Sequence, residues 1–86
     1  MTLPDSSAEV ILYTRRGCHL CDIAKQTLAR ARRSIDFGVQ EVDIDTDPEL
    51  LRQFNDEVPV IFINGRKAFK YRVDEQEFLR VLRARR

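Results

Sequence analysis

The feature that most constrains the fold of this chain is the dipeptide Asn64-Gly65, which separates two strand-like runs. The runs "VPVIFI" (58–63) and "RKAFKY" (66–71) are rich in β-branched and aromatic residues. Asn and Gly accept positive φ at low cost, and a two-residue hairpin turn needs positive φ at both central positions. The sequence therefore predicts an antiparallel β-hairpin over residues 58–71, and the fold must contain a sheet that accommodates it.

Upstream of this hairpin, the sequence predicts a strand, a helix and a second strand. Residues 9–14, "EVILYT", form a short apolar run typical of a buried strand. Residues 18–33 carry small or apolar side chains at intervals of three and four, which is the pattern of one helix face. These side chains are Leu20, Ala24, Thr27, Leu28 and Ala31. In residues 38–45, Val42 and Ile44 alternate with acidic residues, as in a strand with one face in water.

Two further helices complete the predicted order of elements. In "TDPELLRQF" (46–54), an Asp or Thr caps a short helix, and Pro48 stands at its first position, where no N–H is needed. That helix is expected to end near Asn55. The last helix begins near Asp74, and its apolar stripe consists of Phe78, Leu79 and Leu82. The predicted order is β-α-β-α-β-β-α.

This order of elements predicts the architecture. A strand–helix–strand unit of this length makes its two strands parallel through a right-handed crossover, and the hairpin adds antiparallel strands to the same sheet. The expected fold class is α/β, with a four-stranded mixed sheet and three helices on its faces. Eighty-six residues suffice for one modest core and are too few for two ordinary domains. We expect a single domain over residues 1–86, with its core at about 9–84.

The charge balance argues against one broad class of function. Fifteen basic and fourteen acidic residues give a formal net charge of +1, which offers no electrostatic basis for nucleic-acid binding. The basic run is the C-terminal "RVLRARR", and the helix dipole favours Lys and Arg in the last turn of a helix. We interpret this run as a solvated helix end and expect no nucleic-acid partner.

The N-terminal segment and the overall composition bear on localisation. "MTLPDSSAEV" lacks a basic start followed by an apolar core, and no apolar run has the length that crosses a bilayer. We therefore expect a cytoplasmic protein that does not bind membranes. An apolar fraction of 43% with 34% charged residues is typical of a globular domain that folds alone, and we expect a monomer.

Both cysteines of the chain lie in "RRGCHLC" (15–21), spaced Cys-x-x-Cys. A thiol reacts as its thiolate, and the free N–H groups and dipole at a helix start stabilise a thiolate. Cys18 is therefore placed to be a nucleophile, and Cys21, one helical turn further, is within reach to resolve a mixed disulfide on Cys18. The same spacing occurs in zinc sites and in packed structural thiols, so the motif alone leaves three interpretations open.

Three side chains beside the cysteines bear on these interpretations. Arg15 and Arg16 add positive charge, which favours the Cys18 thiolate and offers donors to an anionic thiol substrate. His19 stabilises the thiolate when protonated, helps to bind a metal, or is simply exposed. Tetrahedral zinc needs four ligands, whereas His19 and the cysteines supply three and the chain has no second Cys or His cluster. We predict no metal site within one chain, while a metal or iron–sulfur cluster shared between subunits stays open.

Cys-x-x-Cys at the head of the first helix, followed by Val58-Pro59 before the hairpin, makes the chain resemble the glutaredoxins of the thioredoxin-fold superfamily. The resemblance extends from Val10 to Leu82 and includes "VILYTRRGCHLC", "DIDTDPEL" and "VPVIFING". It implies a thioredoxin-like, glutaredoxin-like fold. Glutaredoxins usually have Pro-Tyr or a similar pair between the cysteines, and the His-Leu pair here resembles the glutaredoxin-like branch with a Cys-x-Leu-Cys signature.

The resemblance also implies roles for the cysteines and for the segment before the hairpin. Cys18 would be the attacking thiol and Cys21 the resolving thiol. Pro59 would be a cis-proline that faces the cysteine pair. The Val58 backbone would then be free to pair, strand-like, with a bound peptide or glutathione.

Three further residues belong to the candidate substrate-binding or glutathione-binding group. Arg15 matches a basic residue that the family often keeps three positions before the first cysteine, where it can meet a glutathione carboxylate. Asp74 lies near the family's acidic residue at the start of the last helix, and His19 lies between the cysteines. Where glutaredoxins commonly carry Gly-Gly before that acidic residue, this chain has "YRVD" (71–74), whose side chains would crowd the close backbone approach that glycines permit.

Two functional hypotheses follow. The first is a small thiol–disulfide oxidoreductase that works through a Cys18–Cys21 dithiol on a disulfide-containing protein or a glutathione mixed disulfide. It would bind no cofactor tightly, and glutathione would be its reductant or co-substrate. The second is a non-enzymatic module with the same fold, which holds a partner protein or an iron–sulfur cluster bridging two subunits.

Overall fold

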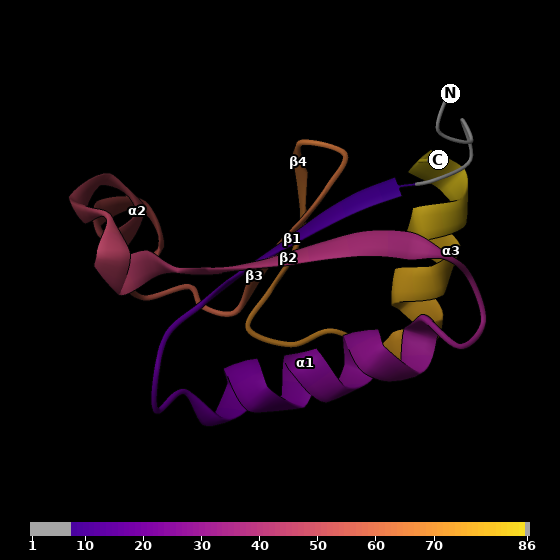
Figure 1. Ribbon diagram of the computed structural model, residues 1–86, viewed down its shortest axis with the longest axis horizontal. Coiled ribbons are helices and arrows are strands. Elements are labelled where there is room, and N and C mark those ends of the chain that lie inside the picture. The colour runs from indigo at the N-terminus through magenta and orange to yellow at the C-terminus, as the bar shows by residue number, and fades with distance from the viewer. Residues whose placement is uncertain (1–7, 86) are drawn as a thin grey trace.

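The computed structural model describes residues 8–85, so the first seven residues of the N-terminal segment and the final arginine lie outside the described residues. The strands are β1 (Ala8–Thr14), β2 (Phe37–Asp43), β3 (Val60–Ile63) and β4 (Arg66–Lys70). The helices are α1 (His19–Ala31), α2 (Pro48–Phe54) and α3 (Glu75–Arg85), with a 3-10 helix, η1 (Ile44–Thr46), between β2 and α2. This order confirms the predicted β-α-β-α-β-β-α arrangement (Figure 1).

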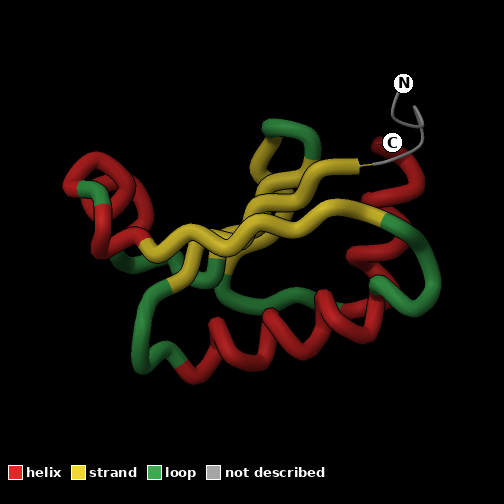
Figure 2. The backbone as a smooth tube through the Cα atoms, viewed as in Figure 1, coloured by secondary structure: helices red, strands yellow, loops and turns green. Residues whose placement is uncertain are grey.

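The four strands form one mixed sheet in the order β2-β1-β3-β4. β1 and β2 are parallel, with Ala8 opposite Phe37 and Thr14 opposite Asp43, because α1 returns the chain to the same end of the sheet. β3 pairs antiparallel with β1 on one side and with β4 on the other. The predicted hairpin is present, and its two turn residues have positive φ, 51° at Asn64 and 82° at Gly65. The expected four-stranded mixed sheet is therefore confirmed (Figure 2).

One face of the sheet is covered by α1 and α3 (Figure 1). The main core lies between these two helices and the sheet. Alternate side chains of β1 point into this core, because successive residues of a strand face opposite sides. The core consists of Ala8, Val10, Leu12, Ala24, Leu28, Ala31, Phe37, Ile61, Ile63, Phe78, Leu79 and Leu82. The predicted apolar stripe of α3 is fully part of it. Of the predicted stripe of α1, Ala24, Leu28 and Ala31 are part of it. Thr27 is buried beside it, and Leu20 is only half-buried.

A second, smaller cluster joins α2 to the other face of the sheet. Its buried members are Ile44, Phe54 and Val60. The Tyr13 ring stacks on Phe54 with ring centroids 4.8 Å apart, and Phe62 packs edge-on against both rings. This cluster fixes α2 close to the end of the sheet from which the cysteine loop emerges.

Three element boundaries differ from the sequence prediction. The helix predicted from Cys18 begins one residue later, with Cys18 as its N-cap, and it ends at Ala31 and not at residue 33. The strand predicted to reach residue 45 ends at Asp43, because the Asp43 carboxylate accepts a hydrogen bond from the Asp45 N–H at 2.9 Å and turns the chain into η1. The start of α1 and the end of β2 are therefore set by side-chain caps. Among residues 8–85, no helix is long and apolar enough to cross a membrane.

Candidate functional site: the Cys18–Cys21 pair

The cysteine pair lies on the loop and first turn that connect β1 to α1. The loop leaves the sheet after Thr14 and reverses at Gly17, whose φ of +73° favours glycine. Cys18 follows as the N-cap of α1, and Cys21 lies in its first turn. The two residues form a disulfide, with their Cα atoms 5.2 Å apart. The sequence therefore brings both cysteines to the N-terminus of one helix, as predicted.

The two sulfur-bearing residues differ in their access to solvent. Cys18 is half-buried, whereas Cys21 is fully buried with a relative exposure of 0%. A reagent in solution can therefore reach the Cys18 side of the pair first, because Cys21 is enclosed by the body of the helix and the sheet.

The helix N-terminus offers hydrogen-bond donors to the Cys18 sulfur. The Cys21 N–H donates to Cys18 Sγ at 3.1 Å, and the Asp22 N–H donates to the Cys18 carbonyl at 3.2 Å. The sulfur thus occupies the position of an N-cap acceptor, where the helix dipole adds positive potential. When the disulfide is reduced, the same N–H group favours a thiolate on Cys18 over a thiol.

The Val58–Pro59 peptide bond is cis, and Pro59 is buried at the start of β3. The last residue pair between β1 and β3 is Tyr13 with Val60. Thr14 follows Tyr13 and Pro59 precedes Val60, so both residues lie at the end of the sheet from which the cysteine loop emerges. The Pro59 carbonyl accepts from the Tyr71 N–H at 2.8 Å. Within the described residues, neither the N–H nor the C=O of Val58 has a backbone hydrogen-bond partner. Its proposed pairing with a substrate stays a prediction.

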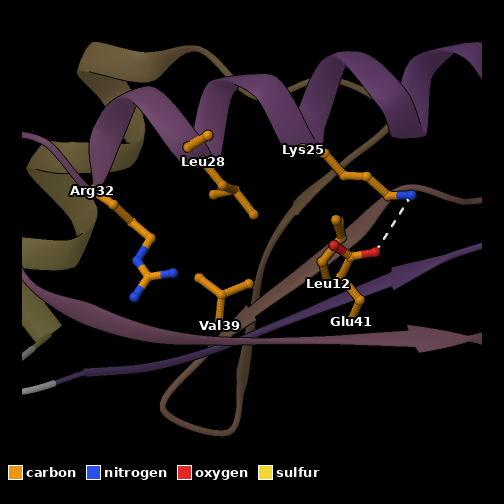
Figure 3. A pocket seen from close by; sticks show the side chains of 7 residues that line it. Leu12, Lys25, Leu28, Arg32, Val39 and Glu41 are labelled. Carbon is orange, nitrogen blue, oxygen red and sulfur yellow. Dashed lines mark ion pairs between the residues drawn. The ribbon is translucent and has the colours of Figure 1, made fainter.

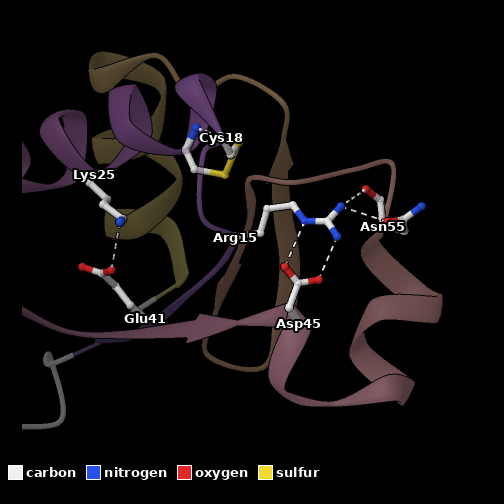
Figure 4. The surroundings of a disulfide bond; sticks show 7 residues. Arg15, Cys18, Lys25, Glu41, Asp45 and Asn55 are labelled. Carbon is white, nitrogen blue, oxygen red and sulfur yellow. Dashed lines mark hydrogen bonds and ion pairs between the residues drawn. A yellow bond between two sulfur atoms is a disulfide. The ribbon is translucent and has the colours of Figure 1, made fainter.

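Arg15 is held by two residues of the segment between β2 and β3, Asp45 in η1 and Asn55 after α2. Its Nη2 and Nε donate to the two carboxylate oxygens of Asp45 at 2.7 and 3.3 Å, and its Nη1 donates to the side-chain oxygen of Asn55 at 2.9 Å (Figure 4). Nη1 also donates to the Asn55 carbonyl at 3.4 Å. The hydrogen bond with Asp45 and the charge of that carboxylate raise the pKa of Arg15 above its ordinary value.

This arrangement limits what Arg15 can offer to a ligand. A guanidinium has five N–H donors, and four of them are used by Asp45 and Asn55. One N–H therefore remains for the glutathione carboxylate predicted from the sequence, and that role stays a prediction. In Figure 4 the guanidinium points away from the cysteine pair, toward Asp45 and Asn55.

The remaining two candidate residues lie at helix N-termini. His19 is exposed at the first position of α1. Asp74 precedes α3, where its carboxylate accepts from the Glu77 N–H at 3.0 Å and its carbonyl accepts from the Phe78 N–H at 2.8 Å. Asp74 therefore caps α3, which occupies one of its carboxylate oxygens.

Two cavities flank the sheet-facing side of α1. One, of about 150 Å³, lies between α1 and β2 and has an apolar floor that includes Leu28 and Val39 (Figure 3). The other, of about 420 Å³, adjoins the cysteine loop and is lined by Thr14, Arg15, Arg16, Gly17, Asp22, Lys25, Glu41 and Asp43. The ion pair between Lys25 and Glu41, at 3.4 Å, stands between the two cavities. Neither cavity is lined by a cysteine, so the cysteine pair lies outside both.

Residues 8–85 contain no group of three or more His, Cys, Asp or Glu side chains that could hold a metal ion. The carboxylate nearest in sequence to the cysteine pair is Asp22, which lines the polar cavity beside the loop.

Sequence reasoning missed the two partners of Arg15. A signal was present, because parallel strands end at the same edge of a sheet and Arg15 and Asp45 each follow one of these strands. Sequence reasoning named Tyr71 in "YRVD" but missed that it shares a groove with Ile23 of α1. The proximity of these two residues depends on the path of the chain between β4 and α3, which no local pattern specifies.

Comparison with known proteins identifies relatives of this fold and site. The model of the glutaredoxin-like domain (DUF836) matches residues 9–83. An uncharacterized protein of Mycobacterium tuberculosis is 32% identical over 75 residues, which cover 81% of this chain and 77% of that protein. The crystal structure of a structural-genomics target from X. campestris is 36% identical and superimposes with a TM-score of 0.72, covering 87% of this chain and 96% of that one.

A more distant structure extends the likeness of fold. Chloroplastic thioredoxin z superimposes with a TM-score of 0.73 over 91% of this chain and 77% of its own. Its sequence identity is 14%, so this comparison shows the shared thioredoxin-like architecture alone.

Proposed function

The chain belongs to the glutaredoxin-like family, and on that basis we propose that it is a thiol–disulfide oxidoreductase in which Cys18 and Cys21 alternate between a dithiol and a disulfide. The observation that carries this proposal is the asymmetry of the pair. Cys18 is half-buried at a helix N-terminus, and Cys21 is fully buried within disulfide-bonding distance of it. A pair of packed structural thiols would need neither the exposure of Cys18 nor the N–H that points at its sulfur.

The proposed reaction has two exchange steps. The Cys18 thiolate attacks one sulfur of a substrate disulfide, a bond forms between these two sulfur atoms, and the other substrate sulfur leaves as a thiolate that takes up a proton. Cys21 then loses its proton and attacks the Cys18 sulfur, which closes the Cys18–Cys21 disulfide and releases the second substrate thiol. Two electrons pass from the protein dithiol to the substrate, and an external thiol or dithiol must restore the reduced protein.

The helix N-terminus assists the first step. The N–H that donates to Cys18 Sγ stabilises negative charge on this sulfur, which makes Cys18 the better nucleophile near neutral pH. The spacing of the pair, 5.2 Å between Cα atoms, lets Cys21 reach Cys18 without a large movement of the backbone.

We propose two classes of substrate for this site, a disulfide in another protein and a mixed disulfide with glutathione. The unpaired backbone of Val58 beside Pro59 would form strand-like hydrogen bonds with either one. Glutathione would be the reductant or co-substrate, with its carboxylates meeting the remaining N–H of Arg15. The capping role of Asp74 leaves its second carboxylate oxygen for a substrate amine.

The direct test is to equilibrate the purified protein with glutathione buffers of graded redox poise and to determine the thiol state by mass spectrometry. We expect a reversible loss of two hydrogen atoms, that is two protons and two electrons, as Cys18–Cys21 closes, with a sigmoidal dependence on the buffer. In the Cys21→Ser variant, we expect a glutathione adduct on Cys18 in place of the disulfide. If no disulfide forms at any poise, and Cys18 reacts with alkylating reagents no faster than free cysteine, the proposed function is wrong.

A further inference from the structure

The strand β2 forms one edge of the sheet. It pairs with β1 on one side, and no other strand within residues 8–85 pairs with its second side. An edge of this kind presents a row of backbone N–H and C=O groups that a further strand can use, and proteins commonly protect it with lysine or proline. The opposite edge, β4, has the sequence "RKAFK" with two lysines, whereas β2, "FGVQEVD", contains neither lysine nor proline. The edge of β2 is therefore open to strand addition.

On the face of the sheet that α1 covers, this edge is hollowed. The cavity of about 150 Å³ lies there between α1 and β2, with Leu28 and Val39 in its apolar floor (Figure 3). Val39 packs against the main core and is half-buried, so part of its side chain remains for another contact. Directly opposite residues of paired strands bring their side chains together. A strand added to β2 with an apolar residue opposite Val39 would therefore cover the cavity.

Opposite charges lie on the two sides of Val39 along β2. Toward the start of the strand, the Arg32 guanidinium lies 5.9 Å from the centroid of the Phe37 ring, and Arg32 forms no ion pair within the described part of the chain. Toward the end of the strand, Glu41 contacts Lys25 at 3.4 Å, and its side chain keeps a relative exposure of 53%. Figure 3 shows Arg32 and Glu41 at opposite ends of the cavity, with Val39 between them.

This arrangement of charges is complementary to itself. If a second copy of β2 pairs antiparallel about Val39, the two Val39 residues lie opposite each other, and Phe37 lies opposite the second copy's Glu41. That Glu41 then meets Arg32 beside the Phe37 ring, and the twofold axis repeats the contact. An axis at Gln40 would instead place Glu41 opposite Val39, which brings a carboxylate over the apolar cavity. Charge and polarity together therefore favour the pairing about Val39.

We propose that two copies of this chain associate through β2 to form one continuous sheet, with Val39 at the twofold axis and two Arg32–Glu41 ion pairs between the copies. The interface lies away from the proposed redox site. Val39 pairs with Val10 in the middle of β1, and the cysteine loop follows Thr14 at the end of that strand. Antiparallel association therefore places the two cysteine loops at opposite ends of the dimer. The composition led us to expect a monomer, and the oligomeric state in solution decides between the two.

The first experiment measures this oligomeric state for the oxidised chain of residues 1–86. Sedimentation velocity over a series of protein concentrations at low salt gives the dissociation constant. We expect a concentration-dependent dimer whose dissociation constant rises with salt, because salt screens the ion pairs. Amide chemical shifts that change with concentration should be confined to β2 and the part of α1 that faces it. A protein that stays monomeric up to about 1 mM, or shift changes at β4 in place of β2, would overturn the proposal.

Charge reversals test the register of the pairing. In Arg32→Glu and in Glu41→Arg, like charges meet between the copies, and we expect the dissociation constant to rise about tenfold or more. The double variant exchanges the two charges, so the ion pairs form again with reversed polarity and the dimer should return. Glu49→Arg is the matched control for Glu41→Arg, because it changes the net charge equally on α2. It should change the dissociation constant by no more than about twofold.

Two further measurements separate the interface from effects within one chain. Arg32 and Glu41 are exposed, so the single variants should melt close to the temperature of the wild-type protein. Lys25→Met removes the contact of Glu41 within its own chain and should keep the dimer. If the double variant does not recover the dimer, or if Glu49→Arg weakens it as much as Glu41→Arg does, the copies do not pair about Val39 and the proposal is wrong.

Discussion

Arg15 and Asp45 face each other with two parallel hydrogen bonds, at 2.7 and 3.3 Å, although thirty residues separate them in the chain. Arg15 belongs to the loop that carries Cys18, and Asp45 belongs to η1, which leads into α2. Asn55, at the end of α2, holds the remaining nitrogen of the guanidinium. The cysteine loop is therefore fastened to the α2 region at the edge of the sheet. This connection lets a residue outside the site influence the position of Cys18.

We predict that Asp45→Asn and Arg15→Lys each slow the reaction of Cys18 with a disulfide, because neither replacement can form two parallel charge-assisted hydrogen bonds. The double variant should react no more slowly than the slower single variant, since both remove the same contact. Stopped-flow measurement of thiolate release gives the rates. Arg52→Lys is the matched control, because Arg52 pairs with Glu49 on the exposed surface of α2, away from the loop. If Arg52→Lys slows the reaction equally, the Arg15–Asp45 contact does not position the cysteine loop for the reaction.

The difference in burial between the cysteines predicts the order of their chemical modification. In the reduced protein, a small alkylating reagent should modify Cys18 much faster than Cys21, because Cys21 has no exposed surface. Peptide mapping of partly alkylated protein measures both rates. Unfolding in denaturant is the control, since it should bring the two rates close together. Faster modification of Cys21 in the folded protein would reverse the assigned roles.

The burial of Phe78 allows a prediction of how much the free energy of unfolding depends on packing in the core. Its ring is completely buried, 5.3 Å from the Phe37 ring and 6.1 Å from the Phe69 ring between centroids. Phe78→Ala should lower the free energy of unfolding by about 3–5 kcal/mol, because it leaves a cavity under the sheet. Urea unfolding of the oxidised protein measures this loss. Arg83→Ala, on the exposed side of the same helix, should change it by less than about 0.5 kcal/mol.

The hairpin turn allows the free-energy cost of backbone strain to be measured separately from the cost of steric crowding. A methyl group on Gly65 would meet no atom within 4 Å, but φ there is +82°. Gly65→Ala should therefore destabilise the protein by about 1–2 kcal/mol through backbone strain alone. At Gly38 the φ is not positive and an added methyl group meets only the flexible end of Glu9, so Gly38→Ala should cost less. Equal losses at the two positions would show that φ does not limit the turn.

The contact between Glu57 and Lys67 predicts a dependence of stability on pH. The hydrogen bond from Lys67 lowers the pKa of Glu57 below its ordinary value of 4.5. A lowered pKa in the folded state means that the contact stabilises the protein above pH 4.5 and that this stabilisation is lost as the pH falls through the lower folded value. Glu57→Gln should therefore lower the melting temperature at neutral pH and have little effect at strongly acidic pH. In a Lys67→Gln background, this difference between the two pH values should largely disappear.

Local signals in the sequence were sufficient for the elements and for the location of the cysteine pair at a helix start. Asn64-Gly65 predicted the hairpin because only a turn with positive φ at both positions suits that pair. The apolar run of residues 9–14 predicted the buried strand β1, and Cys18 at a helix start predicted that free N–H groups of the helix would favour its thiolate. Each of these depends on residues within a few positions of one another. The family resemblance added the segment around Pro59, where the peptide bond is cis.

What the sequence by itself determined is the order of strands and helices, the mixed sheet and the location of the two cysteines, because short-range periodicity, caps and turns encode them. Only the tertiary structure decided that Asp45 and Asn55 occupy the donors of Arg15, and that Tyr71 and Ile23 share one groove between α1 and the segment after β4. These contacts join residues 30 to 48 positions apart. They exist because β1, β2 and β4 run in the same direction and therefore end at the same edge of the sheet. No local pattern can specify this arrangement.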